Sequence, residues 1–216
     1  MVVSKSAAAS PMPMTSVDEL SPADRVLVGD TPQIRALVAA AREGDRTAFD
    51  ELVAIYHRTV FRTAMAALGR REDAEDATQD AFVLAWRKVS HFRGDSTFKT
   101  WILTIVWRQA LDRRRSRSRW WQRTSSWRVG DSAAHDDMDR LISLEADPER
   151  QSQARHRIRQ VRQAMDRLSP KLRDTLLLAA SGDHGYSEIA QMLRVPVGTV
   201  KWRVAEARRL IQRELS

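Results

Sequence analysis

Apolar residues recur every three or four positions along most of this chain, and glycine or proline separates the segments in which they do so. In the segment 46–68, for example, Phe49, Leu52, Tyr56 and Val60 follow this spacing, which is that of one face of an α-helix. No segment shows the strict alternation of apolar and polar residues that is typical of a β-strand. The spacing therefore predicts an all-α protein.

Changes in composition divide the chain into four parts. We expect a disordered N-terminal segment, a helical bundle, a linker and a second helical domain over residues 1–30, 31–119, 120–147 and 148–216, respectively. The stretch 131–149 holds seven acidic residues and one basic residue, Arg140, directly after an arginine-rich segment. Such a charge run is either a solvated connection or a segment with a role of its own. The predicted fold is thus two helical domains joined by a flexible acidic linker.

The charge balance indicates the kind of partner. Of 216 residues, 36 are Lys or Arg and 28 are Asp or Glu, which gives a formal net charge of +8 and favours a polyanionic partner such as nucleic acid or an acidic membrane surface. The apolar runs are too short for a membrane span and the N-terminus lacks the apolar core of a secretory signal, so we expect a cytoplasmic protein without membrane insertion. We expect the natural start at Met1, Met12 or Met14, and no sensor domain beyond Ser216.

The sequence offers no site for catalysis or for a cofactor. Cysteine is absent, which excludes disulfides and thiolate metal ligands. The five histidines are scattered singly, without metal-ligand spacing, and there is no glycine-rich loop of the kind that binds phosphates. We therefore expect no catalytic residue, no metal ion, no cofactor and no enzymatic activity.

The segment 186–215, YSEIAQMLRVPVGTVKWRVAEARRLIQREL, has the pattern of a helix-turn-helix. A short helix is followed by the break VPVGT and by a longer helix that starts near Gly198 or Thr199. The apolar stripe of the longer helix consists of Val200, Val204, Ala207 and Ile211. The side chains that point away from it include Lys201, Trp202 and Arg209. A second helix with a basic outer face is typical of one that enters the DNA major groove, although an ordinary helical hairpin with a solvated face has the same pattern.

Two blocks of the sequence resemble conserved regions of the extracytoplasmic-function (ECF) sigma factors of bacterial RNA polymerase, in the sigma-70 family. The block DAEDATQDAFVLAWRKVSHFRGDSTFKTWILTIV, residues 73–106, resembles region 2. The block LSPKLRDTLLLAASGDHGYSEIAQMLRVPVGTVKWRVAEARRLI, residues 168–211, resembles region 4. With the helix that contains DRTAFDELVAIYHRTVF, the resemblance covers roughly residues 32–115 and 148–214. It implies a protein that binds core polymerase, recognises the −35 and −10 promoter elements and promotes DNA melting at initiation.

The resemblance also implies partners and site residues. Core polymerase would be bound through the coiled coil of its largest subunit and the flap of its second-largest subunit, promoter DNA is the second partner, and an anti-sigma factor is the third. The residues implied in core binding are Asp76, Gln79, Asp80 and Arg87. Those implied at the −10 element are His91, Phe92, Arg93, Asp95, Ser96, Lys99, Trp107, Arg108, Arg113, Arg114 and Arg115. Those implied at the −35 element are Thr199, Lys201, Trp202, Arg203, Arg208 and Arg209.

The spacing assigns different roles to the tryptophans of the helix that begins near Phe98. Trp101 shares a face with Phe98 and Ile102, so we expect it in the core. Trp107 lies nearly opposite and next to Arg108, so we expect it to contact unpaired DNA or a partner. The tryptophans beyond the resemblance could fold back on the bundle, stack on DNA or bind a regulator; they are Trp120, Trp121 and Trp127.

Three positions depart from the family pattern. Arg108 stands where many of these sigma factors carry an asparagine that helps to select a flipped base. Trp202 stands where a small residue commonly follows the basic residue of the recognition helix, and Glu206 stands where a basic residue is frequent. Glutamate can accept a hydrogen bond from cytosine but repels phosphate. The promoter sequences of the best-known members are therefore not expected to apply to this chain.

A stand-alone helix-turn-helix transcriptional regulator is the main alternative function. It would use the same C-terminal half, as a dimer on a palindrome, but it would give no reason for the motif DAEDATQDAF or for the acidic linker. An RNA-binding protein would suit the arginine- and tryptophan-rich segment 100–128, but no pattern of a known RNA-binding module is present. Binding of duplex DNA by the chain without core polymerase would distinguish a regulator from a sigma factor.

Overall fold

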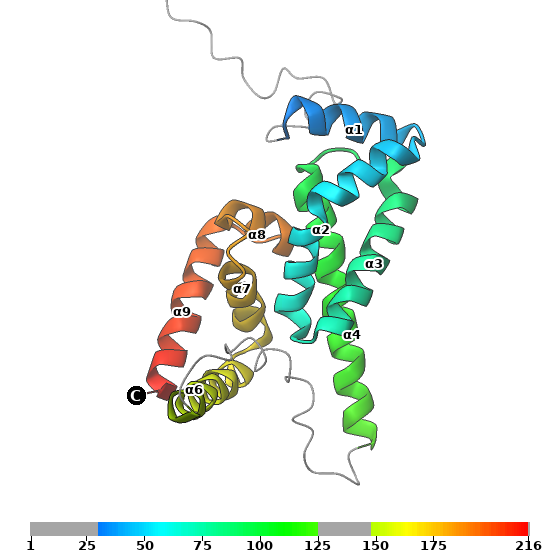
Figure 1. The fold of residues 1–216 in the computed structure, drawn as a ribbon. Coiled ribbons are helices and arrows are strands. Elements are labelled where there is room, and N and C mark those ends of the chain that lie inside the picture. The colour runs from blue at the N-terminus through cyan, green and yellow to red at the C-terminus, as the bar shows by residue number, and fades with distance from the viewer. Residues whose placement is uncertain (1–29, 125–147, 216) are drawn as a thin grey trace, which may run out of the picture.

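A computed structural model of the chain describes residues 30–124 and 148–215. Its helices are α1 (Pro32–Arg42), α2 (Arg46–Leu68), α3 (Arg71–Lys88), the short 3-10 helix η3 (Val89–His91), α4 (Phe98–Thr124), α6 (Pro148–Arg167), α7 (Pro170–Ala180), α8 (Tyr186–Leu193) and α9 (Val197–Leu215). The described residues contain no strand and form two groups of helices, so the all-α prediction is confirmed (Figure 1). Most of the expected linker, including Trp127, lies outside the described residues, as does the expected N-terminal segment before Asp30.

Helices α1 to α4 form the N-terminal half, in which α1 lies across one end of the bundle made by α2, α3 and α4 (Figure 1). Alanines allow these helices to approach closely, because Ala64 of α2 and Ala74, Ala77 and Ala81 of α3 are all fully buried. The helix α4 continues to Thr124, past the boundary expected at residue 119.

Side chains and glycine set the ends of the first helices as the sequence suggests. The Thr31 hydroxyl accepts a hydrogen bond from the Ile34 N–H at 3.3 Å, and Pro32 occupies the first position of α1. The Asp45 carboxylate accepts from the Ala48 N–H at 3.1 Å to cap α2. Gly69 ends α2 with φ 71°, a left-handed conformation that glycine adopts without steric cost.

Helices α6 to α9 form the C-terminal half. The core of this half is made by Leu178 of α7, Ile189 of α8 and Val200 and Val204 of α9, all almost fully buried. The turn of the helix-turn-helix begins at Arg194, which has φ 54° although it is not glycine. The Val195 N–H donates to the Ala190 carbonyl at 3.0 Å and closes the end of α8.

The two halves touch each other, a contact that no local sequence pattern predicts. The helix α8 and the turn before it lie beside α2 and α4 (Figure 1). The buried apolar residues of both halves form one continuous cluster. Among the residues that the structure describes, no helix is both long enough and apolar enough to cross a membrane.

Candidate nucleic-acid interfaces

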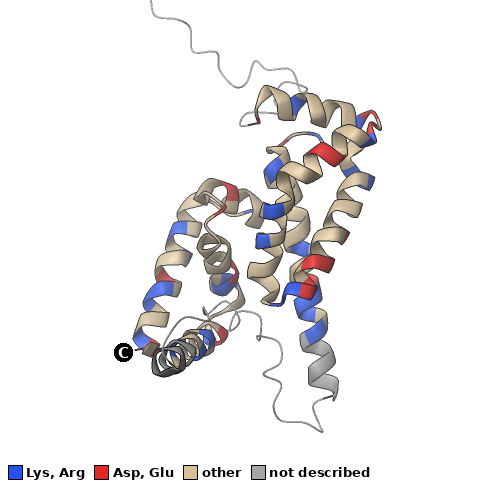
Figure 2. Ribbon diagram, viewed as in Figure 1, with Lys and Arg blue, Asp and Glu red and all other residues tan. Residues whose placement is uncertain are grey.

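The recognition helix α9 has one buried and one open face. Val200, Val204 and Ala207 are at most 2% exposed and pack toward the other helices of the C-terminal half, as the stripe predicted. Trp202 is 62% exposed, which is the highest value among the large apolar side chains that the structure describes. Lys201 and Arg208 are exposed beside it, and Figure 2 shows basic residues repeated along α9. This candidate −35 surface is therefore an open basic face around one tryptophan.

The other residues expected at the −35 element are either partly buried or paired with another side chain. Thr199 lies half-buried in the first turn of α9, and Arg203 is half-buried. Arg209 donates two hydrogen bonds to the Glu206 carboxylate, from Nε at 2.8 Å and from Nη2 at 2.7 Å. The bonds from Arg209 lower the pKa of Glu206, and Glu206 in turn raises the pKa of Arg209. Glu206 thus holds Arg209 on the surface of the helix and is not a free acceptor for a base.

The loop 91–97 rests on a cluster of aromatic rings. Phe92 is 3% exposed, and its ring centroid lies 5.9 Å from that of Phe98 and 5.0 Å from that of Trp101. The expectation that Phe92 faces DNA is therefore wrong for this arrangement, because the loop is anchored through that side chain. The exposed residues of the loop are His91, Arg93 and Asp95, and Ser96 is half-buried.

A carboxylate from far along the chain caps α4 at the end of this loop. The Phe98 N–H donates to Asp30 Oδ2 at 2.9 Å, and the Thr100 N–H donates to the Thr97 hydroxyl at 3.1 Å. Burial raises the pKa of Asp30, although the bond from Phe98 opposes this. Burial and the charge of Asp30 also raise the pKa of Tyr56 to about 12. Asp30 therefore connects the segment before α1 to the loop 91–97, a link that the sequence analysis missed.

The consecutive arginines of α4 point in different directions, because successive helix positions are about 100° apart. Arg113 pairs with Asp80 and lies 3.7 Å from Asp76 on α3. Arg114 pairs with Asp174 of α7, in the other half. Arg115 lies 3.5 Å from Asp112 and is exposed. Arg113 and Arg114 are thus engaged by carboxylates of other helices and only Arg115 pairs within α4, so these three residues do not form one phosphate-binding row.

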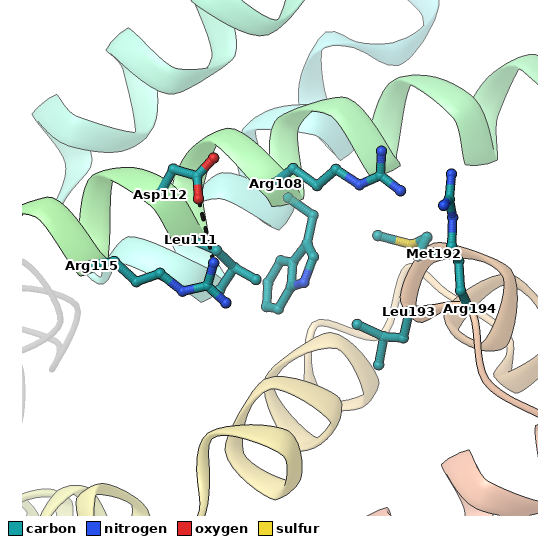
Figure 3. Close-up of a pocket in the computed structure, with 8 residues that line it drawn as sticks. Arg108, Leu111, Asp112, Arg115, Met192, Leu193 and Arg194 are labelled. Carbon is teal, nitrogen blue, oxygen red and sulfur yellow. Dashed lines mark hydrogen bonds and ion pairs between the residues drawn. The ribbon is translucent and has the colours of Figure 1, made fainter.

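Trp107 is 1% exposed, so the expectation that it faces outward is wrong. The helix α4 buries a first face in its own bundle and a second face against α8, where Met192 and Leu193 line the same pocket as Trp107. The pocket has a volume of about 370 Å³, and Arg108 and Arg194 extend toward the same side of it (Figure 3). Arg108 is exposed, as expected. Trp101, predicted to lie in the core, is half-buried in the aromatic cluster.

The residues expected to bind polymerase lie on the open face of α3. Asp76, Gln79, Asp80 and Arg87 are all exposed. Val83 lies between them and is 47% exposed. From Asp76 through Gln79 or Asp80 and Val83 to Arg87 each step is three or four positions, so these residues form one stripe along the helix. The two carboxylates of this stripe, Asp76 and Asp80, face Arg113 of α4. Acidic residues of α3 and basic residues of α4 therefore lie side by side (Figure 2).

A group of polar contacts, which we call the interdomain contact, joins α2 and α4 to the C-terminal half. Arg62 of α2 donates to the Ser181 carbonyl at 2.8 Å and lies 3.1 Å from Asp183 Oδ2. Lys99 of α4 donates to the Asp183 carbonyl at 3.0 Å and lies 2.9 Å from Glu188 Oε1.

The remaining members of the interdomain contact are the Arg114–Asp174 pair and a buried bond between Thr63 and His184. The side chains on α2 and α4 are basic or hydroxylic, and those from the C-terminal half are acidic or imidazole. Two residues expected at the −10 element, Lys99 and Arg114, are therefore occupied by the C-terminal half in this arrangement.

Comparison with known proteins shows the family. The model of sigma-70 region 2 matches residues 52–120, and that of sigma-70 region 4 matches residues 158–211. The RNA polymerase sigma-H factor of Pseudomonas aeruginosa is 31% identical over 183 residues, which are 85% of this chain and 94% of the relative. The ECF RNA polymerase sigma factor SigM of Mycobacterium tuberculosis is 33% identical over 179 residues, 83% of each chain. The chain therefore belongs to the sigma-70 family of RNA polymerase sigma factors, in the ECF group.

Solved structures share the fold. The structure of CnrH in complex with the cytosolic domain of CnrY matches 85% of this chain and 97% of that chain, with a TM-score of 0.57 and 23% identity. The sigma factor RpoE in complex with the anti-sigma factor NepR from Bartonella quintana matches 77% and 96%, with a TM-score of 0.55 and 23% identity. Both support the arrangement of two helical domains.

Proposed function

We propose that this chain binds core RNA polymerase and directs it to promoters in which α9 recognises the −35 element and the loop 91–97 with α4 binds the −10 element. The observation that carries this proposal is the open basic face of α9, built on a helix-turn-helix in a chain that belongs to the ECF group. The role requires no bond to be made or broken by the chain itself. It places the protein in the cytoplasm, where the polymerase works.

At the −35 element, α9 enters the major groove as the second helix of a helix-turn-helix does. Trp202 lies at the centre of the open face, where its apolar ring can contact a thymine methyl group. Lys201 and Arg208 flank it and can bind base edges or phosphates, whereas the half-buried Arg203 suits a phosphate. Trp202 thus determines sequence preference, and Arg203 contributes affinity without preference.

At the −10 element, the exposed His91, Arg93 and Asp95 and the nearby Lys99 and Arg108 contact the unpaired strand. A base that leaves the stack costs a few kcal/mol, which contacts with the protein must offset. Lys99 is bound to Glu188 and Asp183 when the halves touch. The −10 element can therefore use Lys99 only when the C-terminal half moves away from α4.

Core polymerase binds the stripe on α3 made by Asp76, Gln79, Asp80 and Arg87, through the coiled coil of its largest subunit, and the C-terminal half meets the flap of the second-largest subunit. The mixed polar stripe around the exposed Val83 supports a protein partner rather than DNA on this face. An anti-sigma factor is a further partner. This is supported by the structure of RpoE, which is a complex with the anti-sigma factor NepR, and by the pocket between α4 and α8, which has both apolar and basic lining residues.

In vitro transcription with core polymerase and a library of promoter sequences tests the proposal. Trp202→Ser should change the preferred −35 sequence, and Arg203→Ala should weaken all sequences alike. Loss of a base contact costs about 1–3 kcal/mol of discrimination. Arg157→Ala removes an exposed arginine of α6 and serves as the matched control, which should change neither property. An unchanged −35 profile for Trp202→Ser would remove Trp202 from the recognition surface, and tight sequence-specific binding without core polymerase would favour a stand-alone regulator.

A further inference from the structure

His184 lies in the short turn between α7 and α8 and is buried against the other half of the molecule. The residue is 8% exposed, and its Nε2 lies 3.1 Å from the hydroxyl of Thr63 on α2, which is fully buried. The bond therefore crosses the interdomain contact at its most buried point. No other histidine that the structure describes is buried, since His57, His91 and His156 are exposed.

The hydrogen bonds of Thr63 favour one form of the imidazole. The Thr63 hydroxyl lies 2.8 Å from the Thr59 carbonyl, which can only accept, and 3.1 Å from His184 Nε2. When the hydroxyl proton is donated to Thr59, His184 carries its proton on Nε2, donates it to Thr63 and has a lone pair on Nδ1. That Nδ1 is buried and has no hydrogen-bond partner among the described residues. Protonation would add an N–H at Nδ1 with no acceptor in place, and a buried donor of this kind is unfavourable.

The charges around His184 act in both directions. Burial is the main effect and lowers the pKa of His184. Glu188 on α8 and Asp183 in the same turn raise this pKa, whereas Lys99 on α4 and Arg62 on α2 lower it. The carboxylates are already engaged by these two cations, at 2.9 Å for Lys99 and Glu188 and 3.1 Å for Arg62 and Asp183. They are therefore poorly placed to stabilise a charged imidazole while the halves touch.

We propose that His184 makes the interdomain contact proton-sensitive. Neutral His184 holds the segment 181–188 against α2 and α4 by its bond to Thr63, and a protonated His184 favours separation of the halves. In the separated form the ring is hydrated and both of its N–H groups can bind water. The binding of −10 DNA by the separated form rests on the proposed function. The separation of the halves does not depend on that function.

The direction and the size of the effect follow from proton linkage. The touching form holds a proton on His184 less readily than the separated form, so touching is favoured at high pH and is weakened as the pH falls below the ordinary histidine pKa of about 6.5. The weakening continues down to the lowered pKa of the touching form. At pH 5.5 the equilibrium between the two forms can shift by at most about tenfold from one such group.

Energy transfer between two dyes on the protein alone tests this. The chain has no cysteine of its own, so Glu51→Cys on α2 and Arg213→Cys on α9 provide two exposed labelling positions, one in each half. Transfer is measured from pH 7.5 to 5.5 at several salt concentrations, because salt weakens the ion pairs and brings both forms into the measurable range. We expect transfer to fall as the pH falls. Energy transfer that does not change with pH in the labelled protein, with His184 intact, would overturn the proposal.

Two variants identify the group that responds. His184→Gln keeps an N–H donor for Thr63 but cannot be protonated, so energy transfer in this variant should stay high at every pH. His57→Gln removes an exposed histidine on α2 and is the matched control, whose profile should follow that of the parent. A response that survives in His184→Gln would contradict the proposal.

An NMR titration of the unsubstituted protein covers the case in which His184→Gln does not fold. The proposal predicts a midpoint for the His184 ring below about 6.5. A midpoint at or above that value would also contradict the proposal. Because neither measurement contains DNA or polymerase, a negative outcome here leaves the proposed promoter function to its own test.

Discussion

The molecule has two candidate DNA-binding surfaces, and each contains a tryptophan followed by an arginine. On α9, Trp202 is 62% exposed, and Lys201 and Arg208 beside it are exposed as well. On α4, Trp107 is 1% exposed because α8 of the C-terminal half covers that side of the helix. The two surfaces thus have similar residues but differ in access, and the difference arises from contacts between the halves rather than from the helices themselves.

This difference predicts an order of events. The −35 surface is available while the halves touch, whereas Lys99 and Arg114 of the −10 surface are engaged by Glu188 and Asp174. The Lys99–Glu188 pair is partly exposed, and such pairs contribute about 0–1 kcal/mol each, whereas the Arg114–Asp174 pair is less exposed. The contact between the halves also buries Trp107 and the Thr63–His184 bond. Polymerase binding would therefore have to supply the free energy that separates the halves. Separation would precede or accompany binding of the −10 element.

The largest expected effect comes from the comparison of the two tryptophans. Trp107→Ala removes a fully buried ring and should lower the free energy of unfolding by about 3–5 kcal/mol. Trp202→Ala removes an exposed ring and should change it by less than about 0.5 kcal/mol. Urea unfolding followed by circular dichroism measures both. Equal losses for the two variants would mean that the difference in access does not exist in solution.

A smaller effect concerns the anchoring of the loop 91–97. Asp30→Ala and Asp45→Ala each remove a carboxylate that caps a helix in the N-terminal half, so each should cost about 1 kcal/mol of stability. Only Asp30 contacts the end of the loop 91–97, so only Asp30→Ala should also weaken binding of a −10 fork DNA by the polymerase complex. Fluorescence anisotropy with a labelled fork measures this. Matching DNA affinities for the two variants would limit Asp30 to a structural role.

The smallest effect lies in the turn of the helix-turn-helix. Arg194 has φ 54°, which is unfavourable for a residue with a side chain, so Arg194→Gly should raise the stability of the C-terminal half by about 0.5–1 kcal/mol. Arg194 belongs to the pocket and not to the outer face of α9, so the −35 preference should stay the same. Thermal unfolding with the promoter-library assay measures both. A lowered melting temperature would show that the Arg194 side chain contributes contacts that outweigh the backbone strain.

Much of the fold could be predicted from the sequence because helix periodicity and helix ends are local properties. The apolar stripe of α9 and the caps of α1 and α2 follow from residues within one or two turns of each other. The outer face of α9 was predicted for the same reason, since the positions opposite a buried stripe are exposed. The engagement of Arg209 by Glu206 is also local, at a spacing of three, and the sequence analysis did not use it.

The errors concern contacts between distant parts of the chain. Trp107 lies opposite one apolar face of α4, but the periodicity of a single helix does not show that a second face packs against α8. Phe92 sits in a polar loop and is buried through rings contributed by α4. Asp30 caps a helix that begins 68 residues later. No local pattern distinguishes these residues from exposed ones, so the covered −10 surface could be found only from the three-dimensional arrangement.

Addition of core polymerase to the protein labelled at Glu51→Cys and Arg213→Cys measures the central claim most directly. The account predicts that energy transfer is high in the free protein at pH 7.5, because the halves touch, and falls when core polymerase binds and frees the −10 surface. Transcription from a test promoter in the same samples confirms that the labelled complex is active. High and unchanged transfer in a complex that initiates transcription would contradict the account, because the −10 surface would then work while covered.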